Sequence, residues 1–496
     1  MLPIVKHQKN LHNKFSNTYN NRKSKERVKI LNEKWQEFNQ YLKHRKVAVL
    51  GVGVSNGPLL DYLYQVGADV SIFDNKKVED LSSKVRNKIT SYAMKGFFGE
   101  TSLENLKDFD LILRSPSILP TRKELSQEEK RGAIVTSEIE LFMKMCPCYM
   151  IGVTGSDGKT TTSTLISKIL EKAGYTCHLG GNIGTPLFTK LPNINKEDIV
   201  ILELSSFQLM QMEVSPQTAV ITNISPNHLN IHHSYEEYIE AKKQIFLHQS
   251  EDNIVVLNYD NDITRKLKDQ IIGKVRYFSS KTKLEDGWVV DDGKIKECHD
   301  RLREHILHTK QIPLRGIHNY ENICAALAAT KDFVEPTIAT KAILEFQAVE
   351  HRLEYLGKIQ DVKWYNDSVS STPTRTIAGL NSFEEEIVLI AGGYDKNIDY
   401  TPLVKPILEK VKALILLGQT AEKIINGVTQ ELEKRQQSLP IFVCDNLEQT
   451  VQIAYKIAKP GQVVLFSPAS ASFDMFENFA QRGQIFKQLV NNLLSK

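Results

Sequence analysis

The chain has 496 residues, of which 41% are hydrophobic and 25% are charged, with 63 Lys and Arg against 59 Asp and Glu. This length exceeds what one hydrophobic core usually serves, so two or three domains are expected. No apolar run approaches the roughly 18 residues of a membrane span, and no secretory signal is apparent. Six scattered cysteines provide neither a disulfide framework nor a zinc pattern. We therefore expect a cytoplasmic protein with no membrane insertion.

The first 46 residues differ in charge from the rest of the chain. Residues 1–46 contain 12 Lys and Arg but 3 Asp and Glu, which leaves the remaining 450 residues mildly acidic. A nucleic-acid or membrane-surface role is conceivable for such a basic segment. A solvated, partly helical N-terminal extension is the simpler interpretation, and no nucleic-acid partner is expected.

The first α/β unit is predicted for residues 47–146. The string "KVAVLGVGVSNG" reads as a strand entering a glycine turn, "PLLDYLYQVGA" as a helix, and "DVSIFD" as a strand that ends at Asp74. This spacing is similar to the dinucleotide-binding fingerprint, with an acidic residue 21 places after Gly53. Asn56 stands at the third glycine position, however, and Gly57 comes one residue late. A nucleotide diphosphate could still bind at this turn, but the departure from the fingerprint weakens the interpretation as an NAD site.

A phosphate-binding loop is predicted in "IGVTGSDGKTTT", residues 151–162. The strict pattern G-x-x-x-x-G-K-[ST] fails by one place, because five residues separate Gly152 from Gly158. Gly158 still permits the required backbone, Lys159 adds a charge, and Thr160 offers a hydroxyl to Mg²⁺. Helix-spaced apolar residues follow, so the loop caps a helix N-terminus, where phosphate is favoured. The alternative is a glycine-rich turn without a ligand.

Two later strand ends carry possible metal ligands. Glu203 ends the predicted strand "DIVILEL", and His228 follows "TAVITNI". In open α/β sheets ligands collect at the carboxyl ends of strands, so this carboxylate and imidazole could share one divalent cation beside the phosphate loop. Taken singly, either residue could be an ordinary polar side chain.

The overall prediction is an α/β protein with three domains, each a mainly parallel sheet with flanking helices. The first domain (47–146) and the C-terminal domain (346–496) are expected to be Rossmann-like, and the central domain (147–345) to resemble P-loop ATPases. In the third domain Asp367, Lys396 and Ser472 each follow a predicted strand. A lysine and hydroxyls suit an anionic substrate such as an amino dicarboxylic acid.

Nine strings in sequence order resemble the Mur ligases, which are ATP-dependent, amide-forming enzymes of cell-wall synthesis. They are "TGSDGKTTT", "GNIGTPL", "ELSSFQL", "NISPNHLNIHHSYEEYIEAKKQIF", "RGIHNYENICAA", "EHRLE", "YNDSVSSTPT", "GGYDKNID" and "SPASASFDMFENFAQRG". The resemblance runs from about residue 47 to the end of the chain. It implies the three-domain fold given above and a function in peptidoglycan precursor synthesis.

Within this family, two of the strings resemble those of members that join glutamate to UDP-N-acetylmuramoyl-L-alanine. The resemblance implies an acyl phosphate intermediate, ADP and phosphate as products, and a monomer with two Mg²⁺ sites. The D isomer of glutamate is expected, but Val369 stands where relatives often have a lysine that helps to bind glutamate, which leaves the handedness open. Asn230 and Ser117 also depart from common family residues.

The resemblance assigns residues to four groups. Those expected to bind ATP are Gly155, Ser156, Asp157, Gly158, Lys159, Thr160, Thr161, Asn319, Asn322, Arg352 and Asp367. Those expected to bind the UDP substrate are Gly53, Val54, Ser55, Asn56, Asp74, Asn75 and Asn182. Those expected to bind glutamate are Lys396, Ser472 and Phe473. The expected metal ligands are Thr160, Glu203, His228 and a carbamylated Lys242, and the expected catalytic residues are Lys159, Lys242, His228 and Glu203.

Three alternatives remain open at this point. A folylpolyglutamate synthase would share the ATP core but would not need the N-terminal nucleotide unit. A dehydrogenase would use that unit but not the phosphate loop. A non-catalytic nucleotide-binding protein would be expected to lack Lys159, Glu203 or His228, and all three are present.

Overall fold

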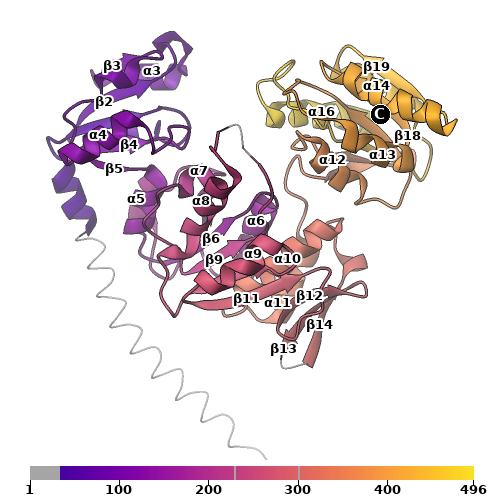
Figure 1. Cartoon of the computed structure of the whole chain (residues 1–496), viewed down its shortest axis with the longest axis horizontal. Coiled ribbons are helices and arrows are strands. Elements are labelled where there is room, and N and C mark those ends of the chain that lie inside the picture. Colours follow the sequence, from indigo (N-terminus) through magenta and orange to yellow (C-terminus); the bar gives the residue numbers. More distant parts are fainter. Residues whose placement is uncertain (1–33, 228–230, 300–301, 496) are drawn as a thin grey trace, which may run out of the picture. The chain divides into compact units, whose positions relative to one another are not determined.

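The computed structural model describes residues 34–227, 231–299 and 302–495, and it contains three β-sheets with flanking helices (Figure 1). The expected three-domain α/β architecture is confirmed. The chain divides into two compact units, which are Met1–Val289 with Glu297–Glu304 and Cys324–Ala339, and Val290–Lys296 with His305–Ile323 and Thr340–Lys496. Among the described residues, no helix has both the length and the apolar character needed to cross a membrane.

The first sheet has five parallel strands in the order β3-β2-β1-β4-β5. Its strands are β1 (Lys46–Leu50), β2 (Asp69–Asp74), β3 (Lys95–Phe98), β4 (Leu111–Arg114) and β5 (Ile134–Thr136). The helices are α2 (Leu59–Gln65), α3 (Ser83–Ser91), α4 (Lys123–Arg131) and α5 (Glu138–Met145). The central strand β1 is an apolar run buried from Val47 to Leu50, as expected for a parallel strand covered on both faces.

Part of the predicted basic extension belongs to this domain. Residues 34–42 form a helix, and Leu42 on it is fully buried. The Trp35 ring lies 5.3 Å from that of Tyr62 on α2 and 5.5 Å from that of Phe188. Aromatic burial of this kind stabilises the junction, so this helix is not a solvated tail. The rest of the predicted extension, residues 1–33, lies outside the described residues.

The second sheet has nine strands in the order β14-β13-β12-β11-β10-β9-β6-β8-β7. They are β6 (Tyr149–Thr154), β7 (Cys177–Gly181), β8 (Ile199–Glu203), β9 (Thr218–Ile221), β10 (Ile254–Asn258), β11 (Lys274–Ser279), β12 (Gly287–Asp291), β13 (Lys294–His299) and β14 (Leu302–His308). Strand β6 is parallel to both of its neighbours, β8 and β9. The segments that follow these three strands therefore meet at one edge of the sheet.

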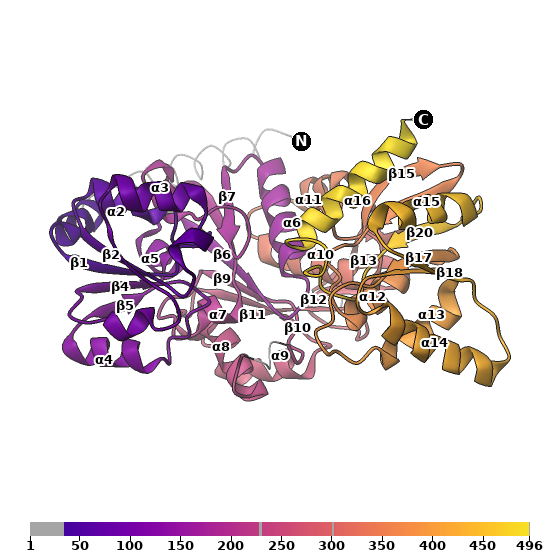
Figure 2. The same cartoon turned by 90° about the horizontal axis from the view of Figure 1, so that it is seen from above.

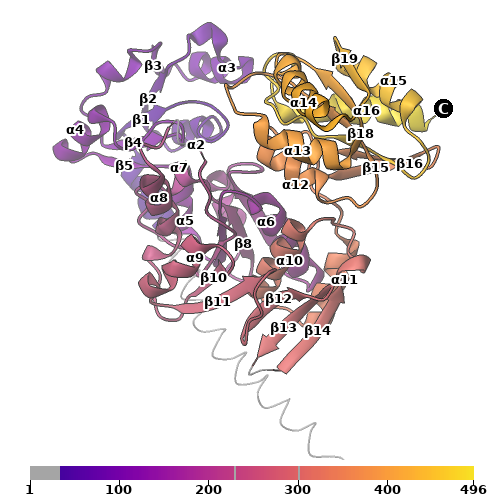
Figure 3. The same ribbon diagram turned by 45° about the vertical axis from the view of Figure 1, so that its right-hand side comes forward.

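Six α-helices accompany this sheet, namely α6 (Lys159–Lys172), α7 (Ser206–Leu209), α8 (Tyr235–Leu247), α9 (Asp262–Lys266), α10 (Ile317–Thr330) and α11 (Pro336–Glu345). Helix α6 starts directly after the predicted phosphate loop. Helix α10 lies beside β11, where Arg276 Nη1 donates to Ala328 O at 2.9 Å (Figure 3).

The third sheet has the order β15-β16-β20-β17-β18-β19, and only β15 is antiparallel to its neighbour. Its strands are β15 (Glu354–Ile359), β16 (Val362–Asn366), β17 (Ile387–Ala391), β18 (Val411–Leu417), β19 (Ile441–Cys444) and β20 (Val463–Phe466). The helices are α12 (Pro373–Leu380), α13 (Thr401–Lys410), α14 (Ala421–Arg435), α15 (Leu447–Ile457) and α16 (Phe479–Leu494). Helices α13 and α14 cover one face and α15 and α16 the other, each pair over its own apolar cluster (Figure 2).

One buried carboxyl group generates a stability prediction. The Glu138 side chain on α5 accepts a hydrogen bond from Phe188 N at 2.8 Å, and burial raises the pKa of its carboxyl group from 4.5 to about 7. The folded chain therefore retains a proton that the unfolded chain releases near its ordinary pKa. The free energy of unfolding therefore falls as the pH rises from 4.5 to about 7, and this group lowers it no further at higher pH.

We expect Glu138→Gln to raise the melting temperature at pH 8 by on the order of 5 °C, because the amide oxygen still accepts the hydrogen bond without a buried charge. Thermal melts at pH 5 and pH 8 check this, with Glu124→Gln as the control because Glu124 has a lowered pKa beside Arg122. An equal shift at both pH values would contradict the assignment.

Candidate functional site

The predicted phosphate loop lies between β6 and α6 and has the backbone that its glycines permit. Gly155 has a φ of +151° and Gly158, which caps α6, a φ of +83°, and both values favour glycine. A Cβ atom at position 155 would overlap Thr222 Oγ1. The loop thus passes close to the segment after β9, and only glycine fits there.

That neighbouring segment fixes the shape of the loop. Asn223 Oδ1 accepts from Asp157 N at 3.0 Å, and Asn223 Nδ2 donates to Asp157 O at 3.2 Å. Thr222 Oγ1 donates to the same carbonyl at 2.5 Å. Ser156 Oγ lies 3.0 Å from Tyr238 Oη of α8. With these bonds in place before any ligand binds, the loop is preorganised.

Two lysines converge on one carbonyl oxygen of this loop. Lys159 Nζ and Lys242 Nζ each donate to Gly155 O, both at 2.8 Å. The side chain of Lys242 is only 1% exposed, and its pKa lies well below the ordinary value, chiefly because of burial and then because of Lys159. Lys243, one position along α8, instead contacts Glu240 Oε1 at 2.6 Å. The side chain of Lys242 therefore lies at the phosphate loop, and burial favours its neutral amine, whereas its expected role as a metal ligand stays a prediction.

The carboxylate at the end of β8 fits a cation. Glu203 is buried, and its Oε1 accepts from Asn182 Nδ2 at 3.0 Å. Its Oε2 is also buried and has no hydrogen-bond partner among the described residues. Buried carboxylate oxygens are seldom left in this state, and an oxygen-preferring cation such as Mg²⁺ would satisfy it. The half-buried Thr160 lies at the start of α6, whereas His228 lies outside the described residues.

A cavity of about 990 Å³ occupies the first domain. Five of the seven residues expected to bind the UDP substrate line it, namely Gly53, Val54, Ser55, Asp74 and Asn75. Four cationic residues also line it, namely Lys76, Lys84, Lys88 and Arg122, together with four acidic residues, namely Asp61, Asp74, Asp80 and Glu100. Asp74 shapes the turn, because its Oδ2 accepts from Val52 N at 3.0 Å. The lining therefore offers cations that can pair with phosphate groups, but its charges balance.

The two remaining UDP-substrate candidates lie elsewhere. Asn56 is fully buried, and its Nδ2 donates to Leu50 O at 3.1 Å and to Leu113 O at 3.3 Å. Its side chain thus joins β1 to β4 and does not line the cavity. Asn182 is exposed and lies next to Glu203.

In the second unit, Asp367 is a buried carboxylate at the end of β16. It accepts from Ser370 Oγ at 2.6 Å and from Ser467 Oγ at 2.8 Å. Burial nevertheless raises the pKa of its carboxyl group to about 6, against a smaller opposing effect of Arg352. Arg352 is therefore near enough to interact with this carboxyl group, as expected if both belong to one site.

The three residues expected to bind glutamate also come together. Lys396 Nζ lies 5.5 Å from the centre of the exposed Phe473 ring, and Ser472 beside it is buried. Tyr394 and Ala471 form a β-bridge that joins the loops after β17 and β20. Because β17 and β20 are neighbouring parallel strands, these loops share one edge of the sheet.

The two asparagines expected near the nucleotide lie on α10, and both are buried. Asn319 Nδ2 donates to Arg315 O at 2.6 Å, and Asn322 Nδ2 donates to Asn319 Oδ1 at 3.3 Å. These bonds fix their orientation. Their expected contact with adenine and ribose stays a prediction.

Sequence reasoning missed Arg375. Its Nη1 lies 3.5 Å from the carbonyl oxygen of Val369, so α12 supplies a cation next to the position where the sequence lacks the expected lysine. The available signal was an arginine six residues after Val369, and the structure places it in the first turn of α12.

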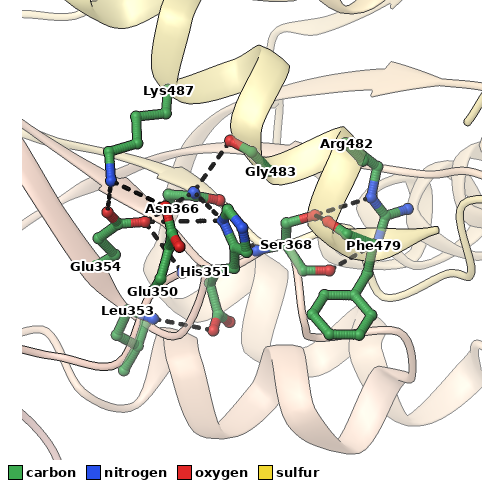
Figure 4. Close-up of polar contacts among 11 residues, drawn as sticks. Glu350, His351, Leu353, Glu354, Asn366, Ser368, Phe479, Arg482, Gly483 and Lys487 are labelled. Carbon is green, nitrogen blue, oxygen red and sulfur yellow. Dashed lines mark hydrogen bonds and ion pairs between the residues drawn. The ribbon is translucent and has the colours of Figure 1, made fainter. Parts of the chain in front are cut away.

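One grouping in the described part of the chain has the spacing of metal ligands, namely Glu350, His351 and Glu354. Figure 4 shows that the ammonium group of Lys487 lies among them. Its Nζ forms ion pairs with both Glu350, at 3.2 Å, and Glu354. The place of a cation is therefore already taken by a side chain, and the grouping is not a metal centre.

The backbone of the phosphate loop generates a prediction that separates steric overlap from the cost of positive φ. We expect Gly155→Ala to weaken ATP binding by about 100-fold, because a Cβ atom forces the loop away from Thr222. Titration with a fluorescent ATP analogue measures this. Gly174→Ala is the control, since Gly174 has a φ of +96° but no heavy atom within 4 Å of the added Cβ. Equal effects of the two variants would contradict the steric explanation.

The chain is similar to known proteins over nearly its whole length. Sequence models match the chain at residues 45–137 ("Mur ligase MurD-like, N-terminal domain"), 153–330 ("Mur ligase middle domain") and 351–470 ("Mur ligase, glutamate ligase domain"). The UDP-N-acetylmuramoylalanine--D-glutamate ligase of Acetivibrio thermocellus is 48% identical over 93% of this chain and 100% of its own length. That of Clostridium acetobutylicum is 44% identical over 92% and 99%.

Solved structures show the same fold at low sequence identity. The MurC ligase of Thermotoga maritima aligns with a TM-score of 0.57 at 18% identity, over 91% of this chain and all of that one. The MurF ligase of the same organism, solved in complex with ADP, aligns with a TM-score of 0.54 at 18% identity, over 92% and 96%. Because three family models match it in order from residue 45 to 470, and relatives at 44–48% identity match nearly its full length, the chain belongs to the Mur ligase family.

Proposed function

We propose that this protein joins D-glutamate to UDP-N-acetylmuramoyl-L-alanine, with conversion of ATP to ADP and phosphate, in peptidoglycan precursor synthesis. The observation that carries the choice of substrates is the near full-length similarity to two ligases with that name. The geometry supports the chemistry, since the chain has a preorganised phosphate loop, a cavity whose lining includes three lysines and an arginine, and a loop cluster that contains Lys396. A cytoplasmic location follows from these substrates as part of the same proposal.

The proposed reaction has two steps. An oxygen of the alanine carboxylate attacks the terminal phosphorus of ATP, the bond to the bridging oxygen breaks, and ADP leaves with that electron pair. The amine of glutamate then attacks the acyl carbon, loses a proton, and expels phosphate to form the amide. Lys159 and the backbone N–H groups of the loop stabilise the charge that accumulates on the transferred phosphoryl group. Exclusion of water protects the acyl phosphate from hydrolysis.

The residues at the loop fit two Mg²⁺ ions. Glu203 Oε2, the Thr160 hydroxyl and a carbamate on Lys242 would supply oxygen ligands, with His228 as a further candidate. When bound, the ions would neutralise negative charge on the phosphate oxygens and favour attack by the carboxylate.

A carbamate on Lys242 is consistent with its surroundings. Only a neutral amine adds to CO₂, and the lowered pKa of this buried amine makes that form accessible. A bond forms between Nζ and the carbon of CO₂, and one proton is released. The product carries a negative charge, which replaces repulsion of nearby cations by attraction.

Each substrate is proposed to contact its own set of residues. The UDP group is proposed to lie in the first-domain cavity, and Asn182 to contact the muramoyl-alanine end. Lys396, Ser472 and Phe473 are proposed to bind glutamate, with Arg375 as a second cation for its two carboxylates. Asn319, Asn322, Arg352 and Asp367 remain proposed contacts of ATP.

An ADP-release assay of the purified protein tests this function. We expect ADP only when ATP, Mg²⁺, UDP-N-acetylmuramoyl-L-alanine and D-glutamate are all present, and L-glutamate to be at least about 100-fold poorer, because a chiral site cannot pair both carboxylates of the wrong isomer. Lys159→Ala is the inactive control. Equal use of other amino acids, or tight binding of NADH without binding of the UDP-sugar, would overturn the proposal.

Adjacent lysines on α8 test the carbamate. We expect Lys242→Ala to lose at least about 100-fold in kcat and to be partly rescued by short carboxylic acids, which replace the missing carboxylate. Lys243→Ala is the matched control, because one step along a helix turns its side chain by about 100° and it contacts Glu240. Steady-state rates with and without added formate or acetate measure the effect. Equal, mild losses at both positions would contradict the carbamate.

A further inference from the structure

The segment Glu350–Glu354 has an unusual backbone on both sides of Arg352. His351 has a φ of +64° and Leu353 a φ of +44°, in the left-handed region that non-glycine residues rarely adopt. Such conformations persist only where surrounding contacts enforce them, and they concentrate at functional sites. Arg352 itself is half-buried. The direction of its side chain therefore depends on whatever fixes its two strained neighbours.

A polar network enforces this backbone from the side of α16 (Figure 4). Glu354 Oε2 accepts from His351 N at 3.0 Å and from Asn366 Nδ2 at 3.1 Å. Asn366 Nδ2 also donates to Gly483 O at 3.2 Å and faces His351 Nδ1 at 3.0 Å. A Cβ atom on Gly483 would overlap the His351 ring, so α16 packs directly against the strained segment.

Lys487, one turn further along α16, joins both ends of the segment. Its Nζ lies 3.2 Å from Glu350 Oε1 and forms an ion pair with Glu354 Oε1. The Glu354 side chain is 12% exposed, so this pair is weakly screened by solvent. One ammonium group therefore clamps the residues on either side of Arg352.

The opposite side of the segment is bonded to the loop after β16. Leu353 N donates to Asp367 Oδ1 at 3.2 Å, and Val369 N donates to His351 O at 3.1 Å. Both strained residues are thus bonded to the loop that carries Asp367. A change at α16 can reach Arg352 and Asp367 through these bonds without any contact to a substrate.

We propose that Lys487 is a positioning residue for the reaction, acting through Glu350 and Glu354 to set the strained segment that holds Arg352, a proposed contact of ATP. The inference rests on the proposed function, in which Arg352 contacts ATP. Lys487 is not proposed to contact a reacting group, because its ammonium group forms ion pairs with Glu350 and Glu354.

A double-mutant cycle on the full chain tests this role. We expect Lys487→Ala to raise KM for ATP about tenfold, to leave KM for the UDP substrate unchanged, and to lower the melting temperature little. In an Arg352→Ala background the same substitution should change KM for ATP less than twofold, because its effect passes through Arg352. Lys487→Arg should recover most of the loss, since it retains the charge.

The matched control is Lys358→Ala. Lys358 forms an ion pair with Asp361 in the same domain, but the pair is exposed and separate from the strained segment. We expect it to behave as the unmodified chain. Effects of Lys487→Ala that multiply with those of Arg352→Ala, or that fall equally on both substrates, would overturn the inference, as would failure of Lys487→Arg to recover activity.

The proposed function and this inference fail in different ways. Absence of D-glutamate-dependent ADP release from the unmodified chain overturns both. An active unmodified chain in which Lys487→Ala leaves KM for ATP unchanged overturns only the positioning role. Glu350→Gln gives a second, milder test, since it weakens one arm of the clamp, and it should raise KM for ATP in the same direction.

Discussion

The contact on which the central site depends is the convergence of two lysine side chains on the carbonyl oxygen of Gly155. One of them, Lys242, is buried so deeply that its charged form is disfavoured. A second ammonium group, that of Lys159, lies close enough to add to this effect. An enclosed group of this kind can lose its proton at much lower cost than an exposed lysine. In a lysine with only a structural role such burial would lower stability. In Lys242 it favours the neutral amine, which reacts with an electrophile.

Three buried carboxyl groups, those of Glu138, Asp367 and Glu203, differ in their hydrogen-bond partners and therefore in the roles that they can have. Glu138 accepts a backbone hydrogen bond between two packed elements, and its role is structural. Asp367 accepts from two hydroxyl groups and one backbone N–H, and it is tied to the strained segment around Arg352. Of these three, only Glu203 has a buried oxygen, Oε2, that accepts no hydrogen bond from a described residue. That oxygen is available to a cation, whereas the other two carboxyl groups are satisfied by the chain itself.

The phosphate loop and the segment around Arg352 both contain residues with positive φ, but they differ in residue type and in the contacts that support this backbone. At the phosphate loop, glycines adopt positive φ with little cost, and Thr222 and Asn223, which are 65 and 66 residues from Asp157 in sequence, complete its hydrogen bonds. Around Arg352 the chain uses His351 and Leu353 in the same region of φ, so a larger network is needed to hold them. Part of that network comes from α16, which is more than 100 residues away in sequence. This separation makes the support invisible to any local pattern.

The sequence by itself determined the fold class, the phosphate loop and the family. Glycine, lysine and threonine at fixed spacing dictate a loop conformation through local backbone freedom, and apolar runs that end in polar residues mark the carboxyl edges of parallel strands. The structure decided what depends on distant packing. It buried Asn56 between two strands, packed residues 34–42 of the predicted partly helical extension against the first domain, and placed Arg375 beside Val369. Only the tertiary structure brings Lys487 to Glu354. Contacts between residues far apart in sequence, and the burial and pKa shifts that follow from them, depend on how the folded chain packs, so no local sequence pattern predicts them.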